Sequence, residues 1–300
     1  MVKFSFIKMH GAGNDFVLVD DRGGTFPADR ETVAKIANRP SGVGCEGVIL
    51  LQRSDAADFK MRFFNPDGAE AEMCGNGARC VAAFARDIGA VDGDRMRFET
   101  VAGDVEAEII SPELVKIRMP DPTGLAGDFV NSGVPHRIVP VDDVAKADVE
   151  GEGRRIRCSS EYAPAGTNVD FVEYHAPSRM RIRTYERGVE AESGACGTGA
   201  VAAAVVGVAR YGMKFPVEAS TLGGYVLTVD GKPDGGTVRG VTLTGPVKKV
   251  FSGVFKMESP AGRRRRELIA KSKYDKEGAE YEGFAGQRIA PCQRVHARGA

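Results

Sequence analysis

Two cysteines of this 300-residue chain occur in matching contexts, each directly before a Gly-x-Gly sequence. Cys74 precedes Gly75-Asn76-Gly77, Cys196 precedes Gly197-Thr198-Gly199, and a run rich in Ala follows each motif. This pattern predicts that a helix begins directly after each cysteine. Because a helix N-terminus has unpaired N–H groups and the positive end of the helix dipole, it favours thiolate over thiol. We therefore expect the pKa of both thiols to be lowered by about one unit or more.

The glycines give each motif a second capability. Backbone N–H groups that no side chain covers, at Gly75, Gly77, Gly197 and Gly199, can bind a substrate carboxylate. If two such motifs face one cleft, two sulfurs lie on opposite sides of one ligand. A thiolate on one face can then remove a proton while the opposite thiol returns one, which inverts a stereocentre. This reaction requires neither a cofactor nor a metal ion.

Other uses of the cysteines are less consistent with the sequence. The six cysteines show no C-x-x-C spacing and only four histidines accompany them, so we expect no zinc site. A thiol redox protein that uses Cys74 and Cys196 as a reversible pair is the alternative from a different class. The missing C-x-x-C spacing and the glycine-rich motifs argue against it. A non-catalytic module that binds amino acids would not need thiols on two sides.

Both motifs belong to an internal repeat with an offset of 122 residues. Residues 65–78 (NPDGAEAEMCGNGA) align with residues 187–200 (RGVEAESGACGTGA). A looser similarity pairs Gly13–Val17 with Gly166–Val172. The same order of both similarities predicts two similar α+β domains, each with strands around one central helix.

Short segments that are rich in β-branched and aromatic residues predict a strand-dominated fold. The predicted strands are Phe4–Lys8, Phe16–Asp20, Val48–Gln52, Phe59–Phe64, Met96–Thr100, Val105–Ile110 and Val115–Met119. The predicted helices are Arg30–Asn38, Gly75 to about Ile88 and Gly197 to about Tyr211, the last two apolar nearly all round. Prolines and glycines between Met119 and Gly127 predict a domain boundary there. The expected fold class is α+β, with pseudo-symmetric domains 1–122 and 123–257, each a barrel-like layer of strands around a central apolar helix.

The net charge of zero combines two unlike parts. Residues 258–300 hold ten Lys or Arg and six Asp or Glu, which leaves 31 basic and 35 acidic residues in 1–257. A weakly acidic body argues against nucleic-acid binding, since phosphates require clustered basic charge. Because residues 258–300 are polar with few apolar residues, we expect a disordered tail. A helix from Arg264 to about Lys276 or a weak site for an anionic partner are the alternatives.

Nothing in the sequence predicts export or membrane insertion. The N-terminal MVKFSFIK alternates charged and apolar residues and lacks the apolar core of a signal peptide. The longest apolar run, Ala200 to Ala209, is far shorter than the roughly 20 residues that span a bilayer. We therefore expect a cytoplasmic protein, in a compartment where thiols stay reduced.

Five segments of the chain strongly resemble the diaminopimelate epimerase family. They are KMHGAGNDFVLVD (8–20), FFNPDGAEAEMCGNGARC (63–80), GVPH (133–136), GTNVDFVE (166–173) and YERGVEAESGACGTGA (185–200). The related proline racemases carry His at the position of Asn76, and phenazine-type isomerases lack the paired cysteines. The resemblance implies a homodimer that interconverts LL- and meso-diaminopimelate, without pyridoxal phosphate or metal, in the biosynthesis of lysine and peptidoglycan precursors.

The resemblance also implies roles for individual residues. Cys74 and Cys196 match the family's catalytic thiols, and His136 and Glu186 match groups that tune the two sulfurs. The positions that match substrate-binding groups are Asn14, Asn65, Gly75, Asn76, Asn168, Glu186, Arg187, Gly197 and Thr198. Within this set, the residues after each cysteine match the backbone groups that hold the α-carboxylate. Glu186 and Arg187 match the pair that meets the distal amino-acid end.

Two positions depart from the family pattern. Gly47 stands where many members have Gln, and Val134 stands where many have Asn. Two amide contacts to the distal end of the substrate are therefore missing, although Asn131 lies nearby in the sequence as a replacement. These departures keep a rival open, a racemase of another amino acid such as histidine that uses the same thiol pair with a different distal pocket.

Overall fold

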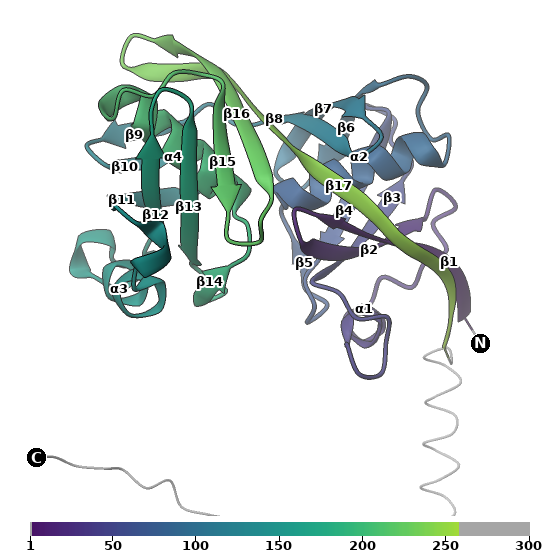
Figure 1. Ribbon diagram of the computed structural model, residues 1–300. Helices are drawn as coiled ribbons and strands as arrows, with labels where there is room; N and C mark the ends of the chain where they lie inside the picture. The colour runs from purple at the N-terminus through teal and green to yellow at the C-terminus, as the bar shows by residue number, and fades with distance from the viewer. Residues whose placement is uncertain (1, 258–300) are drawn as a thin grey trace, which may run out of the picture. The chain divides into compact units, whose positions relative to one another are not determined.

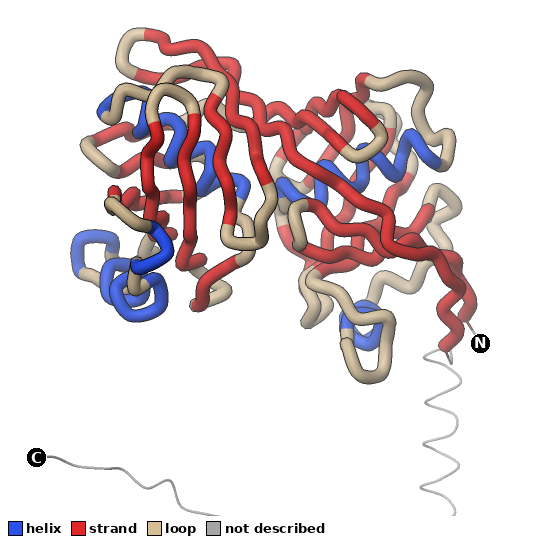
Figure 2. The backbone as a smooth tube through the Cα atoms, in the orientation of Figure 1, coloured by secondary structure: helices blue, strands red, loops and turns tan. Residues whose placement is uncertain are grey.

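Strands make up most of the secondary structure, as the sequence predicts, and helices are few (Figure 2). The structure is a computed structural model that describes residues 2–257, so the predicted tail, residues 258–300, lies outside the described residues. The helices are α1 (Arg30–Ala37), α2 (Gly75–Asp87), α3 (Val149–Arg157) and α4 (Gly197–Arg210), with the 3-10 helices η1 (Val144–Lys146) and η2 (Ser160–Tyr162). The strands are β1 (Val2–Gly11), β2 (Asn14–Asp20), β3 (Gly47–Gln52), β4 (Phe59–Phe64), β5 (Glu70–Ala71), β6 (Arg95–Thr100), β7 (Gly103–Ser111), β8 (Leu114–Arg118), β9 (Thr123–Ala126), β10 (Phe129–Asn131), β11 (Pro135–Pro140), β12 (Asn168–His175), β13 (Arg179–Glu186), β14 (Ala191–Ser193), β15 (Val217–Thr221), β16 (Val226–Asp234) and β17 (Thr237–Met257). Every strand predicted between Phe4 and Met119 forms, with ends that differ by at most three residues.

Helices α2 and α4 begin at Gly75 and Gly197, the residues from which the sequence predicts them. In both cases the preceding cysteine is the N-cap residue and has an extended backbone. Residues 76–85 of α2 and 199–207 of α4 are all buried. Because most of these residues are Ala, Gly or Val, strands can approach the helices from several sides. The prediction that other structure encloses both helices is confirmed.

Helix α3 was not predicted, because its sequence VEGEGRRIR contains two glycines and little apolar periodicity. Its ends nevertheless carry helix signals. Asp148 caps the helix by accepting a hydrogen bond from the Gly151 N–H at 2.9 Å, and acidic residues begin the helix while arginines end it, which complements the helix dipole. Within residues 2–257 no helix combines the length and apolar character that crossing a membrane requires.

A closed circuit of strands surrounds α2. The strands pair in the order β1, β2, β3, β4, β6, β7, β8 and β17, and β17 pairs again with β1. Helix α2 packs against β2, β3, β4, β7 and β8. All elements, apart from the outermost residues of β1 and β17, belong to one compact unit, Phe4–Phe255.

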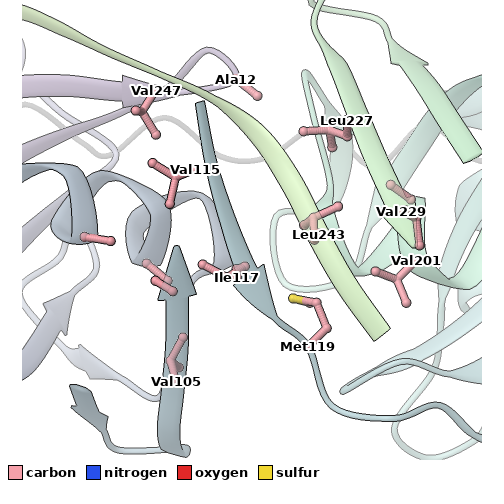
Figure 3. Packing of buried hydrophobic residues seen from close by; sticks show 14 of the residues in the cluster. Ala12, Val105, Val115, Ile117, Met119, Val201, Leu227, Val229, Leu243 and Val247 are labelled. Atoms are coloured by element: carbon pink, nitrogen blue, oxygen red, sulfur yellow. The ribbon is translucent and has the colours of Figure 1, made fainter. Parts of the chain in front are cut away.

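A second group of strands surrounds α4. These strands pair in the order β9, β10, β11, β12, β13, β15, β16 and β17. The 21-residue strand β17 belongs to both groups and runs from one to the other (Figure 1). Ile117 and Met119 at β8 and Leu243 of β17 lie in one hydrophobic core that contains residues of both α2 and α4 (Figure 3). The two groups are therefore joined by a shared strand and a shared core.

The order of elements and pairings in the first group recurs in the second. The parallel pair β2 and β3 is connected through α1, and the parallel pair β11 and β12 is connected through α3. An antiparallel strand follows, β4 or β13, and the strand after the buried helix, β6 or β15, pairs with it in parallel. The offset of 122 residues thus aligns β2 with β11 and β3 with β12.

The looser sequence similarity is wrong as a structural match. Gly13–Val17 leads into β2, but Gly166–Val172 leads into β12, whose counterpart in pairing order is β3. The two segments resemble each other because both place short polar residues where a buried strand begins. At the offset of 122, Asn14 aligns instead with His136, and Glu46 aligns with Asn168.

A glycine in α4 determines how closely this helix approaches β12. A Cβ atom at Gly199 would lie 2.4 Å from Asp170 Oδ1 and 3.3 Å from Cys196 Cβ. The helix can therefore pack at this distance only because position 199 has no side chain. The same geometry places the Gly199 N–H group within 3.4 Å of Cys196 Sγ.

We predict that Gly199→Ala lowers the free energy of unfolding by about 1–3 kcal/mol, since the added methyl group overpacks a buried contact. Urea-induced unfolding of both proteins measures the difference. Gly194→Ala is the matched control, because nothing lies within 4 Å of the position its Cβ would take. Equal stability of Gly199→Ala and the unsubstituted protein would contradict the close packing of α4 on β12.

Candidate active site

The cysteine motifs of α2 and α4 lie next to each other although 122 residues separate them in sequence. Asn76 Nδ2, in the first turn of α2, donates a hydrogen bond of 3.4 Å to the backbone carbonyl of Ala195, directly before Cys196. The carboxylate of Glu186, at the end of β13, acts electrostatically on both Cys74 and Cys196. The structure therefore brings both motifs into one region of the molecule.

Backbone N–H groups surround the sulfur at each helix start. The Gly199 N–H donates to Cys196 Sγ at 3.4 Å, and the Thr198 hydroxyl lies 3.4 Å from the same sulfur. At Cys74 the N–H groups of Gly77 and Asn76 have the corresponding role. Cys74 is partly exposed, whereas Cys196 is 9% exposed. The two sulfurs therefore have similar sets of donors from the first turn of their own helices.

Burial raises the pKa of both thiols. At Cys74 the nearby N–H groups and the charge of Arg79 lower the pKa, but burial outweighs them. At Cys196 burial acts together with the carboxylates of Glu186 and Asp170 and raises the pKa well above its ordinary value.

The expectation of lowered thiol pKa values is therefore wrong. Each helix N-terminus does favour the thiolate, but desolvation of a buried charge is the larger effect. The raised pKa favours proton removal, because a thiol with a higher pKa gives a thiolate that is a stronger base. A strong base suits the removal of a weakly acidic proton from carbon.

A buried chain of polar groups leads from Cys196 into the protein. His136 Nε2 lies 3.0 Å from Thr198 Oγ1, and His136 Nδ1 lies 2.7 Å from Asp170 Oδ2. Thr184 Oγ1 donates to the other carboxylate oxygen of Asp170 at 2.7 Å. His136 and Asp170 are both fully buried. The chain connects the sulfur, through a hydroxyl and an imidazole, to a carboxylate that is held in place.

The sequence did not single out Asp170 as a site residue. Its signal was the spacing to Asn168, because residues two apart on a strand point to the same face. In the parallel register of β11 and β12, His136 lies opposite Asn168. An acid two residues after a candidate ligand on a buried strand could therefore have been predicted to lie beside it.

Asn168 links the imidazole to the end of β13. Its Nδ2 lies 3.3 Å from His136 Nε2, and its Oδ1 accepts a hydrogen bond of 2.7 Å from the Arg187 N–H. The Arg187 guanidinium donates to the backbone carbonyls of Ala165 and Gly166. Burial raises the pKa of the neighbouring Glu186, and Asp170 adds to this effect while His136 opposes it. Asn168, Glu186, Arg187 and His136 thus form one cluster.

On the opposite strand group, Asn14 and Glu46 form a pair. Asn14 Nδ2 donates to Glu46 Oε2 at 2.8 Å, while Asn14 Oδ1 is buried and has no hydrogen-bond partner. The Glu46 carboxylate also acts electrostatically on Glu186, which shows that the pair lies near the cluster on β13. At the offset of 122, the contact between Asn14 and Glu46 is the counterpart of the contact between His136 and Asn168.

Asn65 has no such fixed contact. It follows β4 in a tight turn, with its backbone bonded to Gly68 and Ala69, and its side chain is exposed. The structure does not connect the Asn65 side chain to the other candidate residues. Among residues 2–257 no group of three or more His, Cys, Asp or Glu side chains is placed to hold a metal ion.

Packing explains one of the two positions that depart from the family pattern, Gly47. A Cβ atom at Gly47 would lie 2.4 Å from the Phe63 ring, so this ring occupies the space that a side chain would need. Val134 lies in a turn whose polar contacts come from its neighbours: Ser132 Oγ donates to the Thr198 carbonyl at 2.9 Å. Asn131 accepts from the Gly133 N–H at 3.0 Å, so its oxygen is engaged within this turn.

Several solved structures share the fold. A phenazine biosynthesis protein of the PhzF family from Bacillus anthracis aligns with a TM-score of 0.65 at 16% identity, over 86% of this chain and 100% of that chain. A hydroxyproline epimerase from Agrobacterium vitis aligns with a TM-score of 0.59 at 18% identity, over 87% of this chain and 94% of that chain. At these identities the likeness establishes the fold alone.

Sequence relatives are considerably more similar. The diaminopimelate epimerase of Aquifex aeolicus is 44% identical over 273 residues, which cover 83% of this chain and 96% of that protein. The diaminopimelate epimerase of Hydrogenobaculum sp. is 38% identical over 84% of this chain and 98% of its own length. The family model described as diaminopimelate epimerase matches residues 6–123 and 129–250. With a strand-rich α+β fold and paired cysteine motifs at two helix starts, the chain belongs to the diaminopimelate epimerase family.

Proposed function

We propose that this chain interconverts LL- and meso-diaminopimelate by a cofactor-independent mechanism that uses two thiols. The observation that carries the proposal is the convergence of the Cys74 and Cys196 motifs, which the hydrogen bond from Asn76 to Ala195 holds together. Inversion in which one group removes the proton and another returns one requires proton carriers on both faces of the carbon, and the two cysteines are the proposed carriers. The relatives of Aquifex and Hydrogenobaculum, which carry the name of this activity, supply the substrate class.

The reaction balances without any further reactant. A thiolate at one cysteine takes the α-proton, and the electron pair of the C–H bond remains on the substrate as a carbanion. The backbone N–H groups of Gly75, Asn76, Gly197 and Thr198 bind the adjacent carboxylate, over which the new charge spreads. The thiol of the other cysteine then gives its proton to the opposite face of the carbon. The configuration is inverted, and the negative charge has moved from one sulfur to the other.

The buried chain behind Cys196 supports the proposed tuning roles. Thr198 lies between the sulfur and His136, and Asp170 fixes the imidazole from the other side. Such a chain can adjust the proton affinity of Cys196 as the charge moves. Glu186 acts on both sulfurs and raises the pKa of each, so its carboxylate most strongly disfavours the state in which both are ionised.

The distal amino acid of the substrate is assigned to the residues around Glu186. Asn14, Asn65, Asn168 and Arg187 are the proposed polar contacts. The Glu46 carboxylate can only accept hydrogen bonds, so it fixes the Asn14 amide with Nδ2 towards Glu46. Asn14 Oδ1 is then an unsatisfied acceptor, which suits the N–H groups of an ammonium. A substrate with a second ammonium group matches this arrangement.

A racemase of another amino acid was the closest rival, on the basis of Gly47 and Val134. Packing accounts for Gly47, since the Phe63 ring fills the space beside it. Nothing in the structure favours a single amino acid over diaminopimelate as the substrate. The recurring order of pairings supports the proposed halves, residues 1–122 and 123–257, each of which contributes one cysteine.

We also propose a homodimer in the cytoplasm. A groove of about 370 Å³ is lined by apolar side chains of Phe6, Leu18, Phe84 and Ile88. Val254 of β17 lines the same groove and is 49% exposed, so the groove offers an exposed apolar side chain to a second copy. A cytoplasmic location is consistent with the mechanism, because reducing conditions keep thiols free.

Replacement of Cys74 or Cys196 by Ala is predicted to abolish epimerisation, since each variant retains a proton carrier on one face only. Exchange of the α-hydrogen with solvent deuterium, followed by mass spectrometry for each isomer, should be lost at a different face in each variant. Cys158→Ala is the control, because this cysteine is exposed at the end of α3. Full turnover by both active-site variants would rule out the mechanism.

Glu46→Gln is predicted to raise KM for diaminopimelate roughly tenfold with little change in kcat, because the amide of Asn14 loses its fixed orientation. Steady-state kinetics measure both constants. Glu106→Gln, an exposed acid on β7, is the control and should change neither. An unchanged KM for Glu46→Gln would remove Glu46 from the distal pocket.

Val254→Asp is predicted to convert the dimer to a monomer, because it places a charge in the apolar groove. Sedimentation velocity measures the state of assembly. Val101→Asp, at another exposed valine, should leave the dimer intact. A monomeric unsubstituted protein would contradict the proposed assembly.

A further inference from the structure

Arg79 of α2 is a buried cation without an acidic partner. Its side chain is fully buried, and in the described part of the chain no ion pair includes it. Its hydrogen bonds go to Asn76 Oδ1 at 2.6 Å and to the Gly75 carbonyl at 3.4 Å, while Nε is buried and has no partner. The atoms that receive these bonds belong to the residues directly after Cys74.

The position of this cation is unfavourable in two ways. A guanidinium that is removed from water loses its hydration, and a neutral amide and a carbonyl replace only part of it. Arg79 also lies in the first turns of α2, where the positive end of the helix dipole repels a cation. Both costs fall when an anion lies at the start of the helix. Cys74 supplies such an anion when its thiol ionises.

The charged groups around the two sulfurs differ. Arg79 and Glu186 act on Cys74, and Cys74 in turn acts on the thiol of Cys80. Cys80 is fully buried in the same helix, and burial raises its pKa, so it stays protonated. One cation and one carboxylate therefore face Cys74.

The surroundings of Cys196 are acidic by comparison. Glu186 and Asp170 act on this sulfur, and His136 reaches it only through the Thr198 hydroxyl. At the offset of 122, Val201 has the position in α4 that Arg79 has in α2, and no arginine or lysine is among the main influences on the Cys196 pKa in the described part of the chain. A negative charge is consequently favoured more at Cys74 than at Cys196.

We propose that Arg79 is a positioning residue that makes Cys74 the first of the two thiols to ionise, so that when one of them is ionised in the free protein the thiolate lies at Cys74 and the thiol at Cys196. This assignment rests on the proposed two-thiol function and gives it a direction. The same guanidinium binds Asn76 Oδ1 and so turns Asn76 Nδ2 towards Ala195. Arg79 thereby favours the negative charge on Cys74 and fixes the orientation of the Asn76 amide.

In the free protein, Cys74 is then the sulfur prepared to take a proton. The isomer whose α-hydrogen faces Cys74 binds to this state directly. After one turnover the charge lies on Cys196, beside two carboxylates, and a proton must return from Cys74 to Cys196 before that isomer can react again. This proton arrives at Cys196. That sulfur is the one in contact with the buried chain of Thr198, His136 and Asp170.

The test measures the pH dependence of alkylation by iodoacetamide at each cysteine of the full-length protein, read for each peptide by mass spectrometry. In the unsubstituted protein, Cys74 should reach half its maximal rate at a lower pH than Cys196. In Arg79→Met the Cys74 profile should move up by one pH unit or more while the Cys196 profile stays in place. Arg79→Lys, which keeps the charge, should restore most of the difference.

Arg86→Met is the matched control, since Arg86 lies in the last turn of α2 and is 41% exposed. It should leave both profiles unchanged. The proposal is overturned if Cys196 ionises first in the unsubstituted protein, or if Arg79→Met leaves the Cys74 profile in place. Should Arg79→Met fail to fold, the order of the two profiles in the unsubstituted protein decides. These readouts need no turnover, so a protein with this order of ionisation and no epimerase activity would refute the proposed function alone.

Discussion

Inversion of a stereocentre by two bases without a cofactor imposes one geometric constraint, that two proton carriers lie on opposite faces of the same carbon. In this chain the carriers come from helix starts 122 residues apart, so the fold must bring α2 and α4 together. Strand β17 belongs to both strand groups, and one hydrophobic core contains residues of both helices. The hydrogen bond from Asn76 Nδ2 to the Ala195 carbonyl joins the first turn of α2 to the residue before Cys196.

The electrostatics of the site follow from the same burial that positions it. Enclosing the helices makes their N–H groups effective donors, but it also raises the pKa of the thiols that they carry. The two effects serve different steps, since the donors bind the carboxylate and the raised pKa makes the thiolate a stronger base. Charged neighbours then distinguish the sulfurs, with Arg79 beside Cys74 and Asp170 beside Cys196.

Local sequence predicted the elements that carry the site but not the contacts between them. The starts of α2 and α4 were predictable because Cys-Gly-x-Gly and the following alanines act within a single turn. Burial depends on residues far away in sequence, so the direction of the thiol pKa shift was predicted wrongly. The pairing of Asp170 with His136 depends on the parallel register of β11 and β12, which neither strand encodes alone. The match of Gly13–Val17 to Gly166–Val172 failed for the same reason, because pairing order determines which positions correspond.

In the proposed mechanism, two separate thiols exchange protons with the two faces of one carbon. This mechanism is tested most directly by incubating the unsubstituted protein with LL-diaminopimelate in deuterium oxide and analysing both isomers early in the reaction. With two thiols, newly formed meso product should carry deuterium at the inverted carbon while the remaining LL substrate keeps its hydrogen. Product that retains the original hydrogen would show a single base that returns the proton it removed, which would contradict the two-thiol site.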